Sequence, residues 1–180
     1  MNLRYVITGG PGAGKTTTLS SLAKSGYHCA PESARRIVKH RRAKGLPARP
    51  APMDFGREIL DSDIAQYDKF HHDETLTFFD RGILDALYML NLESGPTPIE
   101  AVEYVDKYPY NKVVFLFPPW EALYTFDTER DQTFAESVKI LEGMRDSYSQ
   151  WSYKTIEVPR MEVDERASFI LDTVNKNLIG

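Results

Sequence analysis

The sequence predicts a three-layer α/β fold, in which helices cover both faces of a central parallel sheet of about five strands. Short apolar runs alternate with segments of helical spacing along the 180 residues, which is the pattern of parallel strands joined by crossover helices. The chain is 42% hydrophobic and 27% charged, a composition typical of a globular protein with a core. At this length we expect one domain over residues 1–180.

Apolar runs and helical spacing define the expected elements of the first half. We expect strands at Leu3–Thr8, Tyr27–Ala30 and Thr75–Phe79, and helices at Lys15–Ser25, Ser33–Lys44, Asp54–Asp73 and Ile83–Leu92. Between the second and third helices, Gly45–Pro52 is a predicted loop. Its prolines lack a backbone donor and restrict the residues before them.

Two capping boxes organise the second half. Thr97–Glu100 and Thr133–Glu136 each place a threonine three residues before a glutamate, so a helix is expected to begin at each. The first should reach Tyr108. Strands are predicted at Val113–Phe117 and Lys154–Val158, and a closing amphipathic helix at Asp164–Leu178. Charged residues interrupt the pattern before the second box, which predicts a lid near residues 121–134.

A glycine-rich segment between the first strand and the first helix carries the most specific motif. It matches G-x-x-x-x-G-K-[ST] in the strand-loop-helix context that this motif requires. Glycines let successive backbone N–H groups approach a polyphosphate, and the helix N-terminus adds free donors and partial positive charge. We therefore expect ATP phosphates to be bound by Gly9, Gly10, Pro11, Gly12, Ala13, Gly14, Lys15, Thr16 and Thr17.

Three side chains in and near this motif suit the chemistry of a bound nucleotide. Lys15 supplies a cation for the β- and γ-phosphates, and the hydroxyl of Thr16 is a ligand for Mg²⁺. Asp80 ends a predicted strand, at the edge of the sheet where ligands bind, so it can also reach the metal. Its alternative role is to cap the helix that follows.

Arg81 follows Asp80, in the place where a water-activating ATPase usually has glutamate. A guanidinium can stabilise a transferring phosphoryl group, but it cannot act as a base for water. The segment FFDRGILD resembles the aspartate-arginine motif of thymidylate kinases and the glutamate-arginine motif of deoxynucleoside kinases. In those families the acid attends the metal and the arginine the phosphoryl group or substrate. Asp85 stands where they usually have serine.

The whole chain most resembles a P-loop family described as an AAA-type ATPase domain and related to ribosylnicotinamide kinases. The resemblance lies in GGPGAGKTT, PESARRIV, FFDRGILDALYM and VVFLFPPWEALYTFDTERDQTFAES. By similarity to deoxynucleoside kinases, Glu32 would be the base for a substrate hydroxyl, and in the lid Arg130 would contact the phosphates. A solvated glutamate at a helix start and an exposed charged helix end are the alternatives.

The predicted function is an ATP- and Mg²⁺-dependent phosphotransferase acting on a small nucleoside-, nucleotide- or metabolite-like acceptor. A nucleotide-dependent regulatory ATPase with a protein partner is the alternative. A polynucleotide 5′-kinase would use the basic run Arg35–Lys44, although we interpret that run as a solvated helix face. The net charge of −4 disfavours a general nucleic-acid binder.

Location is also predicted from the sequence. No stretch of about 18 apolar residues suggests a membrane span, and no leader precedes the first strand. The single cysteine, Cys29, lies in a short apolar run and is expected to be a buried, reduced thiol. These features predict a cytoplasmic protein.

Overall fold

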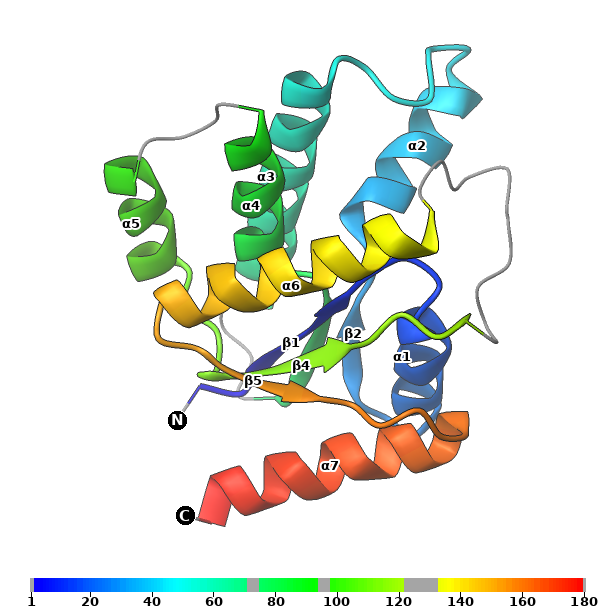
Figure 1. Ribbon diagram of the computed structural model, residues 1–180, viewed down its shortest axis with the longest axis vertical. Helices are drawn as coiled ribbons and strands as arrows, with labels where there is room; N and C mark the ends of the chain where they lie inside the picture. Colours follow the sequence, from blue (N-terminus) through cyan, green and yellow to red (C-terminus); the bar gives the residue numbers. More distant parts are fainter. Residues whose placement is uncertain (1, 71–74, 94–97, 122–132, 180) are drawn as a thin grey trace.

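The protein folds as a five-stranded parallel sheet between two layers of helices (Figure 1). The computed structural model describes residues 2–70, 75–93, 98–121 and 133–179. The strands are β1 (Arg4–Gly9), β2 (His28–Ala30), β3 (Thr77–Asp80), β4 (Val113–Phe117) and β5 (Lys154–Glu157). They lie in the order β2-β3-β1-β4-β5. The predicted three-layer α/β fold is confirmed.

Seven helices are present in the described part of the chain. They are α1 (Lys15–Lys24), α2 (Ser33–Ala43), α3 (Pro52–Lys69), α4 (Ile83–Leu92), α5 (Pro98–Lys107), α6 (Phe134–Gln150) and α7 (Val163–Ile179). Helices α1 and α7 cover one face of the sheet, and α3, α4 and α6 lie on the other (Figure 1). None of the described helices is long and apolar enough to cross a membrane.

The core is divided in two because successive side chains of a strand point to opposite faces. In β1, Tyr5 and Ile7 pack in the cluster beneath α1 and α7, whereas Val6 packs in the cluster formed with α3 and α4. In β3, Phe78 and Phe79 divide in the same way. Every residue of β3 and β4 is buried, which is typical of a parallel sheet covered on both sides.

The register of the parallel strands positions the functional end of the sheet. β1 pairs with β3 and β4, with Ile7 opposite Asp80 and Gly9 opposite Phe117. The carboxyl ends of these strands therefore meet at one edge, where the glycine loop leaves β1 and where β3 ends. A crevice at this edge is where open α/β sheets bind ligands.

Most predicted bounds agree with the structure, and the differences have local causes. Ile83–Leu92 and Val113–Phe117 are observed as predicted. The capping box of α6 is formed, since Thr133 N donates to Glu136 Oε2 at 2.6 Å. Helix α3 begins two residues before the predicted Asp54, because a proline fits the first turn of a helix. Thr97 and residues 122–132 of the predicted lid lie outside the described residues.

Cys29 in β2 is half-buried rather than fully buried. Burial raises the pKa of its thiol to about 11, with the charge of Asp80 adding to the effect. The side chain lies beside α1, where Sγ is 3.5 Å from the Leu19 carbonyl oxygen. The thiol therefore stays protonated at neutral pH.

The packing of α4 against α3 can be tested with two leucines on α4. Leu90 is 2% exposed and Leu92 is 63% exposed. Leu90→Ala is expected to lower the free energy of unfolding by about 2–5 kcal/mol, because it leaves a cavity in the core. Leu92→Ala should cost less than about 0.5 kcal/mol. Equal losses in urea denaturation would contradict this assignment of the core.

Candidate functional site

The glycine loop has the backbone geometry that its sequence predicts. Gly9, Gly12 and Gly14 have φ of 135°, 74° and 82°, a region that side-chain-bearing residues rarely adopt. A Cβ on Gly9 would also overlap the carbonyl oxygen of Phe117 on β4. No side chain caps the N-terminus of α1, so its first N–H groups are available to an anion.

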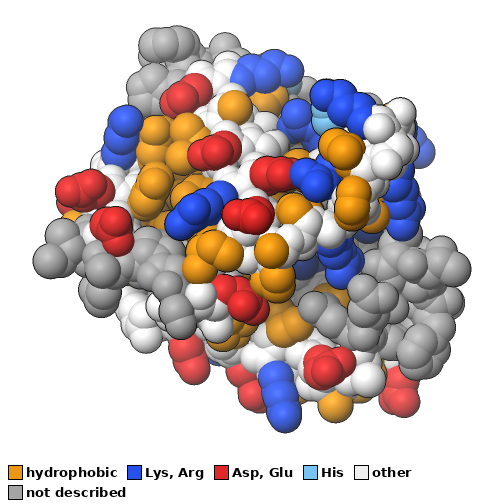
Figure 2. Space-filling view, turned by 90° about the horizontal axis from the view of Figure 1, so that it is seen from above, with side chains coloured by type: hydrophobic (Ala, Val, Ile, Leu, Met, Phe, Trp, Pro, Cys, Tyr) orange, Lys and Arg blue, Asp and Glu red, His pale blue; other side chains and the backbone are white. Residues whose placement is uncertain are grey.

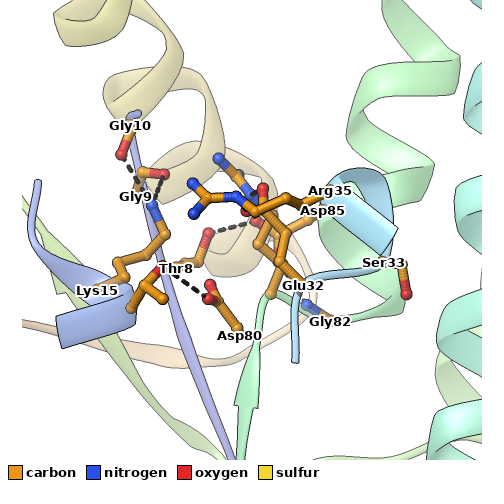
Figure 3. Close-up of polar contacts among 12 residues, drawn as sticks. Thr8, Gly9, Gly10, Lys15, Glu32, Ser33, Arg35, Asp80, Gly82 and Asp85 are labelled. Carbon is orange, nitrogen blue, oxygen red and sulfur yellow. Dashed lines mark hydrogen bonds and ion pairs between the residues drawn. The ribbon is translucent and has the colours of Figure 1, made fainter. Parts of the chain in front are cut away.

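Lys15 lies across this loop (Figure 3). Its Nζ donates to the carbonyl oxygens of Gly9 and Gly10 at 3.0 and 2.8 Å. The side chain is only 7% exposed. Burial, with the charge of Arg81 adding to it, lowers the pKa of the ammonium to about 8. A bound phosphate would favour the charged form that burial disfavours.

Thr16 and Asp80 form a pair of oxygen donors beside the loop. Thr16 Oγ1 lies 3.4 Å from Asp80 Oδ2. Asp80 is 4% exposed, and its Oδ1 is buried without a hydrogen-bond partner. Burial raises the pKa of this carboxyl in spite of the nearby Lys15.

These two residues fit a magnesium ion. A hydroxyl oxygen and an unpartnered carboxylate oxygen are hard donors, and Mg²⁺ in phosphotransferases is commonly held by one or two such groups together with substrate phosphates. Within the described ranges, no group of three His, Cys, Asp or Glu side chains could hold a metal alone. The metal would therefore bind jointly with the nucleotide.

Arg81 and Glu32 form a salt bridge close to Lys15. Arg81 Nε donates to Glu32 Oε1 at 3.2 Å, and its backbone φ is 70°. Although burial opposes the charge, Glu32, Asp85 and Asp80 raise the pKa of the guanidinium. Burial also raises the pKa of Glu32, but the charges of Arg81, Lys15 and Arg35 outweigh it and lower the pKa. Both groups are charged at neutral pH.

Asp85 is a buried junction that the sequence analysis did not identify as a site residue. Its Oδ1 accepts from Thr8 Oγ1 and lies 3.5 Å from Arg81 Nη1. Its Oδ2 accepts from the Gly82 N–H at 2.9 Å and the Tyr148 hydroxyl at 2.6 Å. The carboxylate thus joins β1, the start of α4 and α6. The sequence signal that could have identified this residue is an aspartate within the apolar run ILDALYML.

Arg166 of α7 is a second residue that sequence analysis missed. It is 3% exposed and its Nη1 donates to the Ala13 carbonyl at 3.3 Å. A Cβ on Gly14 would overlap its guanidinium. The guanidinium also lies 5.9 Å from the ring centroid of Trp120. Arg166 therefore supports the glycine loop from α7.

A cavity of about 1000 Å³ begins at the loop and continues between α2, α3, α4 and α6. Glu32, Arg81 and Asp85 line it, whereas Asp80 is not among its lining residues. Its apolar walls include Val38, Phe55, Ile59, Ala86, Met89 and Ile140. Figure 2, seen from above, shows hydrophobic side chains set among acidic and basic ones, with Lys and Arg gathered on the side of α2.

Four of the five predicted catalytic residues meet at the carboxyl edge of the sheet. Lys15, Glu32, Asp80 and Arg81 come from α1, the start of α2 and the end of β3, and they influence one another's pKa values. Arg130, the fifth, lies outside the described residues. The basic run of α2 is mostly exposed, although Arg35 pairs with Glu32 at 3.6 Å.

The fold and the glycine loop define a P-loop NTPase of the kinase-like type. Sequence comparison gives the family: a family described as AAA domain matches residues 4–166, and the chain belongs to it. No curated protein matches the chain.

The solved structures that share the fold include the following two. Deoxyadenosine kinase from M. mycoides, with dCMP and dCDP bound, aligns with a TM-score of 0.58 at 15% identity over 96% of this chain and 99% of that one. Shikimate kinase from Aquifex aeolicus aligns with a TM-score of 0.57 at 17% identity, over 98% and 99% of the two chains.

The junction at Asp85 makes a stability prediction. Its partners are all donors, so Asp85→Asn places an amide N–H against another donor although the shape is conserved. We expect the free energy of unfolding to fall by about 3–5 kcal/mol, the usual cost of breaking a buried charge pair. Asp146→Asn, at an exposed site on α6, is the control. If the two variants have equal free energies of unfolding in urea denaturation, the contacts of Asp85 do not stabilise the fold as described.

The second prediction concerns Asp63 on α3, which is 4% exposed and also lines the cavity. Burial raises its pKa from 3.8 to about 7, with Asp85 and Glu32 adding to the effect and Ser33 and Arg81 opposing it. The folded state therefore holds a proton that the unfolded state releases above about pH 4, so this carboxyl destabilises the fold as pH rises to about 7.

Asp63→Asn removes this proton linkage. Relative to wild type, the variant should gain about 3 kcal/mol of stability between pH 5 and pH 8, from roughly two pKa units. Urea denaturation at several pH values measures this difference. The exposed Asp61→Asn on the same helix should show no such trend. A constant difference between Asp63→Asn and wild type would show that Asp63 is ionised throughout.

Proposed function

We propose that this protein transfers the γ-phosphoryl group of ATP to a hydroxyl of a small nucleoside-, nucleotide- or metabolite-like acceptor, with Mg²⁺. The observation that carries the proposal is the continuity of the cavity. One space of about 1000 Å³ runs from the phosphate-binding loop to a chamber lined by Glu32 and Arg81. That volume is large for a single small ligand, and it suits a donor and an acceptor together.

The loop would hold the donor. Backbone N–H groups of Gly12 and Gly14 and the N-terminus of α1 would bind the phosphates, with Lys15 against the β- and γ-phosphates. To reach them, Lys15 Nζ exchanges its bonds to the Gly9 and Gly10 carbonyls for phosphate oxygens. Thr16 and Asp80 would hold Mg²⁺, which neutralises charge on the phosphates and orients them.

Glu32 and Arg81 would act at the transferred group. Because the pKa of Glu32 is lowered, its carboxylate is available to accept a hydrogen bond from the acceptor hydroxyl and to turn the oxygen toward the γ-phosphate. Arg81 lies 3.2 Å from Glu32, so its guanidinium can stabilise charge on the same phosphoryl group. Asp85 acts through Arg81 as a positioning residue.

Water must be kept from the phosphoryl group in such an enzyme. Asp80 is followed by an arginine that cannot activate water. We assign the lid role to residues near 121–134, with Arg130 toward the phosphates, in a single domain of residues 1–180. The negative net charge and the single reduced cysteine fit a cytoplasmic enzyme with a small-molecule substrate rather than nucleic acid. The shared fold with two proteins named as kinases also supports the proposal.

The direct test is consumption of ATP in the presence of Mg²⁺, with and without a panel of nucleosides, nucleotides and nicotinamide riboside. Lys15→Ala serves as the blank. Stimulation by one compound, with one phosphorylated product per ATP, is the expected result. A slow rate that no compound raises, and that Lys15→Ala abolishes, would instead indicate a regulatory ATPase.

Glu32→Gln gives the sharper kinetic prediction. With the stimulating acceptor, kcat should fall by about 10²–10⁴-fold, because the amide cannot accept the hydroxyl proton. Binding of ATP, measured by titration calorimetry, should change little. Glu58→Gln removes a similar pair with an arginine, Arg41 at 2.7 Å, but lies outside the cavity lining. If both variants keep wild-type kcat, Glu32 has no part in the transfer.

A further inference from the structure

Asp63 is the one ionisable group on an otherwise apolar strip of α3. Phe55, Ile59 and Asp63 follow one another at intervals of four residues, which places them on the same face of the helix, and all three line the cavity. Ala86 and Met89 of α4 line the same space. Such apolar walls suit a flat ring, and Asp63 is a polar group that such a ring would meet there.

One oxygen of Asp63 is engaged and the other is not. Ser33 Oγ donates to Asp63 Oδ1 at 2.5 Å. An ionised carboxylate can only accept, so Ser33 donates this bond, and Ser33 Oγ in turn accepts from Gln66 Nε2 at 2.8 Å. Asp63 Oδ2 is buried and has no hydrogen-bond partner. Above its pKa of about 7, Asp63 is ionised, and a buried carboxylate oxygen without a donor is then costly, so a ligand that supplies one is favoured.

Ser33 also relates this group to the reacting end of the cavity. It follows Glu32 directly at the start of α2, where Figure 3 shows both residues. The Gln66–Ser33–Asp63 chain thus connects α3 to the residue that is proposed to meet the acceptor hydroxyl. A ligand that reaches Asp63 lies in the acceptor part of the cavity rather than on the phosphate loop.

We propose that Asp63 selects the acceptor by accepting a hydrogen bond at Oδ2 from an N–H group on a heteroaromatic ring. The acceptor identity rests on the proposed function, whereas the binding preference does not. The ring would pack between the apolar side chains of α3 and α4. Its hydroxyl-bearing part would extend toward Glu32.

The chain of hydrogen bonds makes Asp63→Asn a specificity switch. Since Ser33 donates to one position, the introduced asparagine keeps its oxygen there and turns its amide nitrogen to the position of Oδ2. The free group then becomes a donor in place of an acceptor. A ring N–H that donates to the carboxylate of the wild type would face the amide N–H of the variant, which is also a donor. A ring nitrogen that only accepts would therefore bind the variant better.

Matched ligands test this switch: adenosine with purine riboside, and cytidine with pyrimidin-2-one riboside, as nucleosides and as 5′-monophosphates. In each pair the second compound lacks the amino group. Uridine with 3-methyluridine tests a ring N–H. Binding is measured by calorimetry without ATP at about pH 8.5, where the carboxyl of Asp63 is ionised. Phosphorylated product is measured by mass spectrometry with Mg-ATP at the same pH.

Wild type should bind the N–H-bearing member of at least one pair about 10- to 100-fold more tightly, and Asp63→Asn should remove or invert that ratio. Asp61→Asn, exposed on the same helix, should leave it unchanged.

Equal binding within every pair, or no binding of any member, overturns the inference even if the variant does not fold, because wild type alone decides it. If product forms but no pair shows a preference, this inference is wrong and the proposed function stands. If a pair shows the preference but no product forms, the inference stands and the proposed function is wrong.

Discussion

The site depends on a cluster of buried charges in which no member is stable alone. Lys15, Asp80 and Asp85 are each less than 9% exposed, and Arg81 and Glu32 are less than one-fifth exposed. An isolated charge in such surroundings would cost several kcal/mol. Glu32 and Asp85 both face Arg81, and the charge of Lys15 favours the ionised form of Asp80. The cluster therefore forms only when α1, the start of α2 and the end of β3 are in place. The fold and the chemistry of the site therefore share the same interactions.

The sheet makes this cluster possible. Parallel pairing of β1 with both β3 and β4 brings the end of each strand to the same edge. The glycine loop leaves there, and Asp80 and Arg81 arrive there. Asp85 then connects the edge to α6 through Tyr148 at 2.6 Å. A change in any of these elements would reach the phosphate loop through contacts between buried polar groups, which tolerate little displacement.

Sequence patterns were sufficient where structure is local. The alternation of strands and helices, the glycine loop and the α6 capping box depend on neighbouring residues, and each is observed. Strand bounds were less secure, since β3 begins at Thr77 whereas the prediction began at Thr75. Cys29 was predicted to be buried but is half-buried, because the exposure of a short strand depends on which elements cover it.

The rest of the site required contacts across the chain. Asp85 meets Tyr148 across 63 residues, and Arg166 meets Ala13 across 153. The link from Asp63 to Ser33 spans 30 residues and depends on the packing of α3 against α2. No periodicity or spacing in the sequence predicts such long-range contacts. The unpartnered oxygens of Asp80 and Asp63 can likewise be identified only once the surrounding helices are placed.

The most direct test of the account is the fate of the γ-phosphoryl group in a single turnover. ATP labelled at the γ-phosphate is mixed with excess enzyme, Mg²⁺ and the acceptor that stimulates ATP consumption. If the buried cluster serves phosphoryl transfer, the label should appear on the acceptor, with little inorganic phosphate. Release of the label as inorganic phosphate at the same rate with and without the acceptor would contradict the account.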